Sequence, residues 1–349
     1  MTCLGSSTES SRAVNFPPFN PVDAPYGSFD LENMDSHGGW VFGSGTIQNA
    51  WYDSGINSWN LQQINQGAET PGAAAAGDPF VSVFGQQQHF AYRDAAGASL
   101  DAWYDSVTKN WSLQQINMSG VTSGAAAVGD PFVTVFGDQQ HFVYRDSTGT
   151  LQDVWYDSGG NTWSLQQINL GGVTKGPAAG GDPCVSVFGQ QHFVYRDLFG
   201  GIWDAWYDAG ANQWKLQQIN LGGRTNAPIA AADPQVLVAG DQHFSYRDGF
   251  GIVWDAWYDA KSGAWQSQQL NGAGGLTNAP AASDGPVAWV DGSKQHFTCV
   301  DANGTIWDSW SDGGTDGWRY QQINQQGVSL ANALNSAMWT ALNGLPSLP

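Results

Sequence analysis

The stretch DPFVTVFGDQQHFVYRDSTGTLQDVWYDSGGNTWSLQQIN, residues 130–169, decides the fold of this 349-residue chain. Side chains suited to strands fill residues 132–136, 141–145, 151–156 and 163–168, and Gly, Asn, Ser and Thr lie between these segments. Alternating side chains bounded by Gly and Asn turns predict strands rather than helices. The stretch therefore predicts four consecutive antiparallel strands.

The same pattern returns six times along the chain. A Trp follows each His by fourteen residues, and a Gln-Gln-(Ile/Leu)-Asn segment then ends each repeat. The six histidines are spaced by 51 to 53 residues: His37, His89, His141, His192, His243 and His296. Four strands at a fixed period of this length are typical of propeller blades. A solenoid is the alternative, but it would need polar capping repeats, and the last copy is nearly as regular as the middle ones.

The sequence thus predicts an all-β fold, a six-bladed β-propeller of four-stranded blades. Residues 1–35 form an N-terminal extension, and the propeller spans 36–349. The repeats lie near 37–65, 78–117, 130–169, 182–220, 233–271 and 284–324. The first copy lacks a clear first strand, whereas residues 336–344 (SAMWTALNG) resemble an unclaimed one. We expect this C-terminal strand to pair with the first blade and close the ring, which would remove an exposed sheet edge.

Composition excludes several classes of partner. The net charge of −19 should repel a phosphate backbone and an anionic membrane surface, so we expect no nucleic acid and no membrane insertion. The N-terminus has no apolar segment typical of a signal peptide. The three cysteines are not a disulfide framework, because their number is odd and their spacing irregular. These features predict a soluble protein that is cytoplasmic or exported by a route without a signal peptide.

Two motifs carry candidate binding chemistry: Tyr-Arg-Asp on the second strand and Asp-x-Trp-Tyr-Asp on the third. Both are complete in four repeats, which hold four of the seven arginines. Arg and Asp can each hydrogen-bond a pair of vicinal sugar hydroxyls, and the C–H face of a sugar can lie on an indole ring. The predicted sugar contacts are Arg93, Asp101, Trp103, Arg145, Asp153, Trp155, Arg196, Asp204, Trp206, Arg247, Asp255 and Trp257. A second tier comprises Tyr92, Tyr144, Tyr195, Tyr246, His89, His141, His192, His243, Asp308 and Trp310.

Each of these side chains also has an architectural interpretation. The Arg between two Asp could form an ion pair that ties one blade to the next. The His could be a hydrogen-bonded core residue, and the Gln and Asn that end each repeat could satisfy backbone groups at the outer edge of a blade. One His per repeat, with no Cys cluster and no calcium-binding loop, predicts neither a metal nor a cofactor. The end copies depart from the pattern, since Val41 and Val300 replace the Arg.

The recurring QHFxYRD, DxWYD and WxLQQIN motifs resemble those of the mushroom β-propeller lectins over all six repeats. The resemblance implies a non-enzymatic lectin that binds glycans with terminal N-acetylglucosamine on glycoproteins or cell surfaces. Several weak sites on one rigid body would raise avidity, and a homodimer would raise the valency further. Two alternatives stay open: a glycoside hydrolase, which needs one asymmetric pair of carboxylates, and a protein-interaction propeller.

Overall fold

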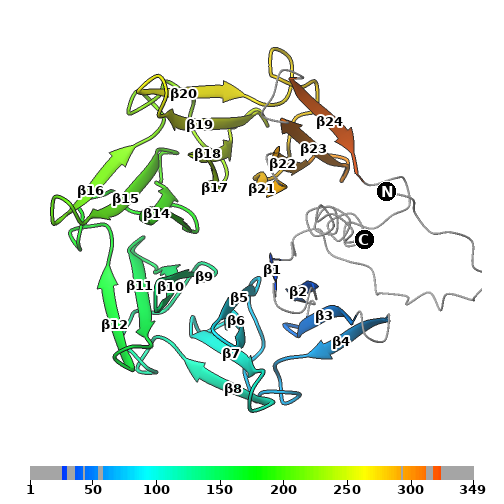
Figure 1. Ribbon diagram of the computed structural model, residues 1–349, viewed down its shortest axis with the longest axis vertical. Coiled ribbons are helices and arrows are strands. Elements are labelled where there is room, and N and C mark those ends of the chain that lie inside the picture. Colours follow the sequence, from blue (N-terminus) through cyan, green and yellow to red (C-terminus); the bar gives the residue numbers. More distant parts are fainter. Residues whose placement is uncertain are drawn as a thin grey trace, which may run out of the picture.

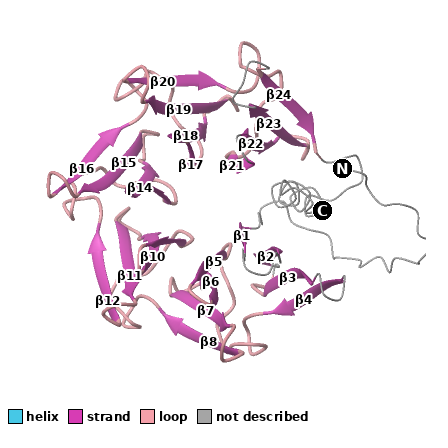
Figure 2. Ribbon diagram, viewed as in Figure 1, coloured by secondary structure: helices cyan, strands magenta, loops and turns pink. Residues whose placement is uncertain are grey.

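The computed structural model describes residues 26–29, 36–41, 44–53, 58–291, 294–311 and 317–323. Every regular element there is a β-strand, and the strands form four-stranded antiparallel sheets arranged around a common centre (Figures 1 and 2). In each sheet, strands that are consecutive in the chain are neighbours. No helix in these residues is long and apolar enough to cross a membrane.

Five of the sheets are blades built on the full repeat. Their strands are β5 (Phe80–Phe84), β6 (Gln87–Arg93), β7 (Ser99–Asp105), β8 (Asn110–Gln115), β9 (Phe132–Phe136), β10 (Gln139–Arg145), β11 (Leu151–Asp157), β12 (Thr162–Gln167), β13 (Cys184–Phe188), β14 (Gln190–Arg196), β15 (Ile202–Asp208), β16 (Gln213–Gln218), β17 (Gln235–Ala239), β18 (Asp241–Arg247), β19 (Val253–Asp259), β20 (Ala264–Gln269), β21 (Val287–Asp291), β22 (Lys294–Val300), β23 (Ile306–Ser311) and β24 (Trp318–Gln322). The first strand of each blade lies innermost, because β5, β9, β13, β17 and β21 contact one another in succession.

The expectation of six blades, with a ring closed by the C-terminal strand, is wrong. The structure shows five blades of the full repeat, each with a bridge between the Asp after its second strand and an Ala of the preceding linker. The strands β1 (Tyr26–Phe29), β2 (Ser36–Val41), β3 (Ile47–Asp53) and β4 (Ser58–Gln63) form a separate sheet beside the β5–β8 blade. Its innermost strand comes from residues 26–29, which the sequence assigned to the extension. A strand so close to β2 costs less chain entropy to pair than one about 300 residues away. Residues 336–344 lie outside the described residues.

The core lies between successive sheets. In four of the five blades, one face presents a Phe and a Tyr of the second strand to the preceding sheet, and in the β21–β24 blade Cys299 takes the place of the Tyr. Phe193 and Tyr195 of β14 pack with Val143 and Leu151 of the preceding blade, and all four side chains are fully buried. Full burial of a large apolar side chain contributes about 1.5 to 3 kcal/mol. Because both faces of an interior blade are covered, apolar residues are not confined to one alternating set.

A buried Asn closes each of the five repeats whose final Asn lies among the described residues. Asn169 accepts a hydrogen bond from the Leu151 N–H (2.8 Å) and donates to the carbonyl oxygens of Gly149 (2.9 Å) and Pro177 (2.8 Å). It therefore joins the third strand, the turn before it and the linker that follows. This confirms that the terminal Asn satisfies backbone groups. The same three contacts recur at Asn65, Asn117, Asn220 and Asn271.

We predict that Asn169→Ala destabilises the fold by about 3 kcal/mol, because it leaves buried backbone groups without partners. Thermal unfolding followed by circular dichroism should show a lower Tm. The control is Asn110→Ala at an exposed strand position, where a change within about 0.5 kcal/mol is expected. Equal Tm values for the two variants would contradict the structural role of Asn169.

Candidate functional site

The predicted Arg, Asp, Trp and His side chains share one face of each blade. In the β9–β12 blade, His141 is opposite Trp155, Val143 is opposite Asp153, and Arg145 is opposite Leu151. Trp155 lies four residues along β11 from Leu151, so roughly 13 Å of strand separates the Trp and Arg positions. The structure therefore spreads the set along the face, with the Arg at one end, the Asp in the middle and the Trp toward the other end.

The third-strand Asp is enclosed in a polar network. Asp153 has no exposed surface; it accepts hydrogen bonds from His141 Nδ1 (2.9 Å) and Gln166 Nε2 (2.8 Å). In this arrangement the carboxylate fixes the orientation of the imidazole and is not accessible to a ligand. The same His–Asp–Gln contacts hold Asp101, Asp204 and Asp255, and Asp308 pairs with His296 and Thr298.

The third-strand Trp stacks on the same His. The ring centroids of His141 and Trp155 lie 5.6 Å apart with an interplanar angle of 17°. The indole is half-buried, whereas the imidazole is buried. The same stacking places Trp103, Trp206, Trp257 and Trp310 on His89, His192, His243 and His296. The indoles are thus the more accessible members of these pairs.

The second-strand Tyr lies on the opposite face, in the core. Tyr144 is fully buried, and a Cβ built on Gly124 would lie 2.3 Å from its hydroxyl, so the linker passes directly over the phenol. Burial raises the pKa of Tyr92, Tyr144, Tyr195 and Tyr246 and keeps these phenols neutral. Tyr246 donates to the Pro228 carbonyl oxygen (3.0 Å). These side chains support the blades.

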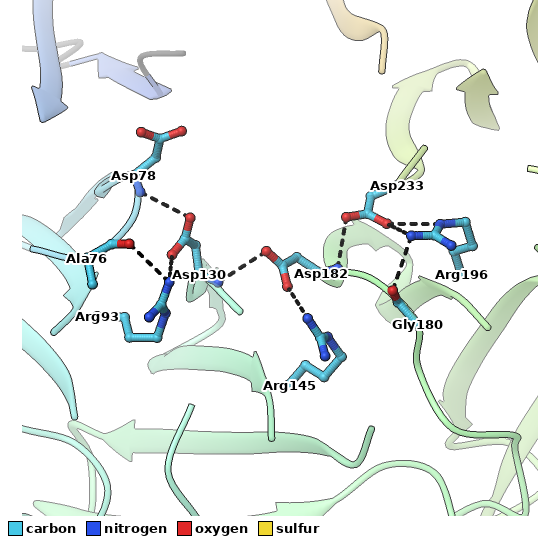
Figure 3. Close-up of polar contacts among 9 residues, drawn as sticks. All are labelled: Ala76, Asp78, Arg93, Asp130, Arg145, Gly180, Asp182, Arg196 and Asp233. Carbon is cyan, nitrogen blue, oxygen red and sulfur yellow. Dashed lines mark hydrogen bonds and ion pairs between the residues drawn. The ribbon is translucent and has the colours of Figure 1, made fainter. Parts of the chain in front are cut away.

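The Arg reaches across to the next blade. Arg196 forms an ion pair with Asp233, in which Nη2 and Nε each lie 3.1 Å from Oδ1, and it also donates to the Gly180 carbonyl oxygen (3.1 Å). The Nη2–Oδ1 distances for the equivalent pairs are 3.4 Å between Arg93 and Asp130 and 3.5 Å between Arg145 and Asp182. The Asp comes 37 residues after the Arg and precedes the innermost strand of the following blade. Figure 3 shows the three pairs side by side.

These aspartates also link to one another. The Asp78 N–H donates to Asp130 Oδ2 (3.0 Å), the Asp130 N–H to Asp182 Oδ2 (3.1 Å), and the Asp182 N–H to Asp233 Oδ2 (2.9 Å). Sequence reasoning missed these residues. The signal was present, since an Asp-Pro pair precedes the inner strand in four repeats. We call Arg93, Asp130, Arg145, Asp182, Arg196 and Asp233 the Arg–Asp chain.

The Arg–Asp chain is partly open to solvent. Its Arg side chains are 18 to 23% exposed and its Asp side chains 29 to 37%. Nε of Arg93 and of Arg145 is buried and has no protein partner. In the next blade Arg247 instead donates to the backbone oxygen of Asp248 (3.2 Å), and its Nε also lacks a protein partner. The guanidinium groups are therefore partly exposed at the junctions between blades, whereas these Nε atoms are enclosed.

One member of the Arg–Asp chain has a shifted pKa. The pKa of Asp182 is raised to about 6, chiefly by burial. The Asp130 N–H and Arg145 act to lower it, and the nearby carboxylates of Asp233 and Asp130 act to raise it. The side chain is 37% exposed as a whole, but its Oδ1 is enclosed. The enclosed oxygen explains why the carboxylate is costly to charge.

We predict that the Asp182→Asn variant loses stability relative to the wild type as the pH falls from 7.5 to 4.5. The folded-state pKa lies above the ordinary value, so the folded protein binds a proton in this range and the wild type is stabilised by acid. The variant lacks this proton uptake. Tm measured across the range should therefore show a difference, variant minus wild type, that is largest at pH 7.5.

The matched control is Asp138→Asn, which removes an exposed carboxylate of the same blade region. Its Tm difference from the wild type should change less with pH. A Tm difference for Asp182→Asn that is constant from pH 7.5 to 4.5 would contradict the raised pKa.

Among the described residues, no group of three or more His, Cys, Asp or Glu side chains could hold a metal ion.

Cys299 and Val300 replace Tyr and Arg in the β21–β24 blade, and burial raises the pKa of Cys299 to about 12. This blade keeps the Asp–His pair but lacks the Arg.

No protein-family model and no curated protein matches the chain. Solved structures match its fold. BP39L lectin from Burkholderia pseudomallei is 20% identical, with a TM-score of 0.64 over 87% of this chain and 84% of that one. A variant of Aleuria aurantia lectin in complex with Fucalpha1-6GlcNAc is 12% identical, with a TM-score of 0.56 over 89% and 98%. AofleA from Arthrobotrys oligospora is 10% identical, with a TM-score of 0.55 over 87% of each chain. At these identities the likeness shows that the chain shares the all-β propeller fold of these proteins.

Proposed function

We propose that this protein is a multivalent, non-enzymatic lectin that binds glycans ending in N-acetylglucosamine at the junctions between blades. The observation that carries the proposal is the repetition of partly exposed Arg–Asp pairs at three junctions between blades. A planar guanidinium beside a carboxylate offers donors and acceptors to two neighbouring sugar hydroxyls. Three equivalent junctions on one rigid body supply the valency that weak sugar sites need.

The comparisons support the proposal. Proteins of this fold include several named as lectins, two of them studied with fucosides. A triple arginine-to-alanine variant of AofleA, with the three positions 53 residues apart, has also been crystallised. That interval is one or two residues longer than the spacing of the Arg positions in this chain, which is 51 or 52 residues. The choice of N-acetylglucosamine rests on the resemblance of the motifs to the mushroom lectins.

Several of the predicted contacts have a defined part in this proposal. The Arg–Asp chain supplies the polar contacts, and its Asp members replace the buried third-strand Asp as partners of the Arg. The His–Asp–Gln networks hold the face that carries the arginines. The half-buried indoles of Trp103, Trp155, Trp206 and Trp257 remain predicted contacts for a sugar at the other end of that face. Agglutination does not require a homodimer, since one chain carries several junctions.

A combined Arg93→Ala, Arg145→Ala and Arg196→Ala variant should lose binding to immobilised terminal N-acetylglucosamine. Hydrogen bonds to charged groups contribute about 1.5 to 3 kcal/mol, so each site should weaken roughly 10- to 150-fold. A glycan array and erythrocyte agglutination measure the loss. Arg→Lys at the same positions keeps the charge but not the planar fork, and should give intermediate binding.

The matched control is Arg224→Ala, since Arg224 is exposed and lies outside the Arg–Asp chain. Circular dichroism and Tm of the triple variant separate loss of binding from loss of fold. Retained agglutination by a folded triple variant would assign the arginines to architecture alone. Incubation of wild-type protein with a p-nitrophenyl N-acetylglucosaminide should release no p-nitrophenol, and steady release would support the hydrolase alternative instead.

A further inference from the structure

The turn after the Arg position has the same backbone in all five blades. In the β13–β16 blade, Asp197 Oδ1 accepts hydrogen bonds from the N–H groups of Phe199 (2.7 Å) and Gly201 (2.9 Å). In the β17–β20 blade, Asp248 Oδ1 accepts the Phe250 N–H (2.8 Å) in the same way. The turn does not require Phe, because Ala96, Thr148 and Asn303 make the equivalent contact in the other blades.

The two phenyl rings are open to solvent. Phe199 is 80% exposed and Phe250 is 87% exposed, more than any other large apolar side chain in the described residues. Rings this exposed contribute little to the core. Their backbones are nevertheless rigid, since Trp203 Nε1 and Trp254 Nε1 hold the second oxygen of each turn Asp at 2.8 and 3.0 Å. Folding of the core therefore does not explain why Phe occupies both of these turn positions.

The linker between these two blades connects the turns. The Ala230 N–H donates to the Gly200 oxygen (2.9 Å), and the Ala231 N–H donates to the Arg247 oxygen (2.8 Å). Ile229, which is 51% exposed, lies against the first turn, because a Cβ built on Gly200 would be 2.4 Å from its Cγ1. Phe199, Ile229 and Phe250 thus belong to three exposed segments joined by these hydrogen bonds, and we call them the apolar strip.

The apolar strip occurs at one junction only among the described blades. The residue equivalent to Ile229 is Ala elsewhere: Ala74, Ala126, Ala178 and Ala281. Arg196 lies three residues before Phe199, and Arg247 three residues before Phe250. An apolar surface therefore begins beside the polar groups of the Arg positions at this junction.

We infer that the apolar strip is a subsite for the second unit of an N-acetylated oligosaccharide whose terminal sugar lies at the adjacent arginine. The inference rests on the proposed lectin function. A β-linked acetamido sugar offers a C–H face and an acetyl methyl, both of which pack favourably on phenyl and isoleucine side chains. The junction between the β13–β16 and β17–β20 blades then binds a disaccharide more tightly than a monosaccharide, whereas the other junctions bind the terminal sugar alone.

The surroundings favour a sugar over other occupants. The net charge of −19 opposes docking on an anionic membrane. Arg196 and Arg247 lie three residues before the two Phe positions, and Arg196 pairs with Asp233, so polar groups suited to hydroxyls belong to the same segments of chain. A neutral ligand with alternating polar and apolar faces fits this combination.

The test compares N-acetylglucosamine and N,N′-diacetylchitobiose by isothermal titration calorimetry. The variant is Phe199→Thr combined with Phe250→Thr, which installs the residue found at Thr148. Wild-type protein should bind the disaccharide at one site more tightly than at the others, and the variant should weaken that site about 5-fold. Binding of the monosaccharide should not change. Val107→Thr, at an exposed apolar residue outside the strip, is the matched control.

The possible outcomes distinguish failure of the subsite from failure of the lectin proposal. Equal disaccharide binding by the double variant and the wild type would overturn the subsite while leaving the lectin proposal intact. Failure of wild-type protein to bind either sugar would instead overturn the lectin proposal. If the double variant alters self-association in analytical ultracentrifugation but not disaccharide affinity, the strip is a protein interface and the inference is wrong.

Discussion

The buried Asn that ends five of the repeats is the contact on which the arrangement of the described residues depends. Asn169 holds the Gly149 turn, the start of β11 and the linker at Pro177. That turn directly follows Arg145, and that linker leads to Asp182. One side chain therefore fixes both ends of the segment that brings an Arg and the Asp of the next blade together. Packing between the faces contributes more free energy, but it does not determine this register.

The His–Asp–Gln network explains how so many acidic residues fit into the interior. A buried carboxylate is tolerated only when its oxygens are hydrogen-bonded. Asp153 meets that condition with His141 and Gln166. The Arg–Asp chain is different, because its ion pairs lie at the junctions between blades and remain partly exposed to solvent. The molecule therefore separates its carboxylates into a set enclosed within the blades and a partly exposed set at the junctions between them.

Local regularity made much of the fold predictable from the sequence. The strand pattern and the period correctly predicted four-stranded blades, and the offset of twelve residues between His141 and Asp153 is compatible with one hairpin face. Contacts between blades were not predictable in this way, because Arg145 and Asp182 belong to different hairpins with no shared register. The missing strand of the first sheet was misassigned because residues 26–29 carry no repeat motif and residues 336–344 look strand-like. Exposure, which decides whether an Asp can reach a ligand, depends on the neighbouring blade and cannot be derived from a single repeat.

The chain of aspartates from Asp78 to Asp233 is made of equivalent links, each formed by one backbone N–H and one carboxylate. Because several equivalent hydrogen bonds connect the blades, the fold can tolerate the loss of one of them. Repeats can then diverge independently, as the last blade has done with Val300 in place of Arg. Redundancy in the scaffold leaves single junctions free to acquire new surface chemistry, and the phenyl rings of two adjacent turns are an example of such individual change.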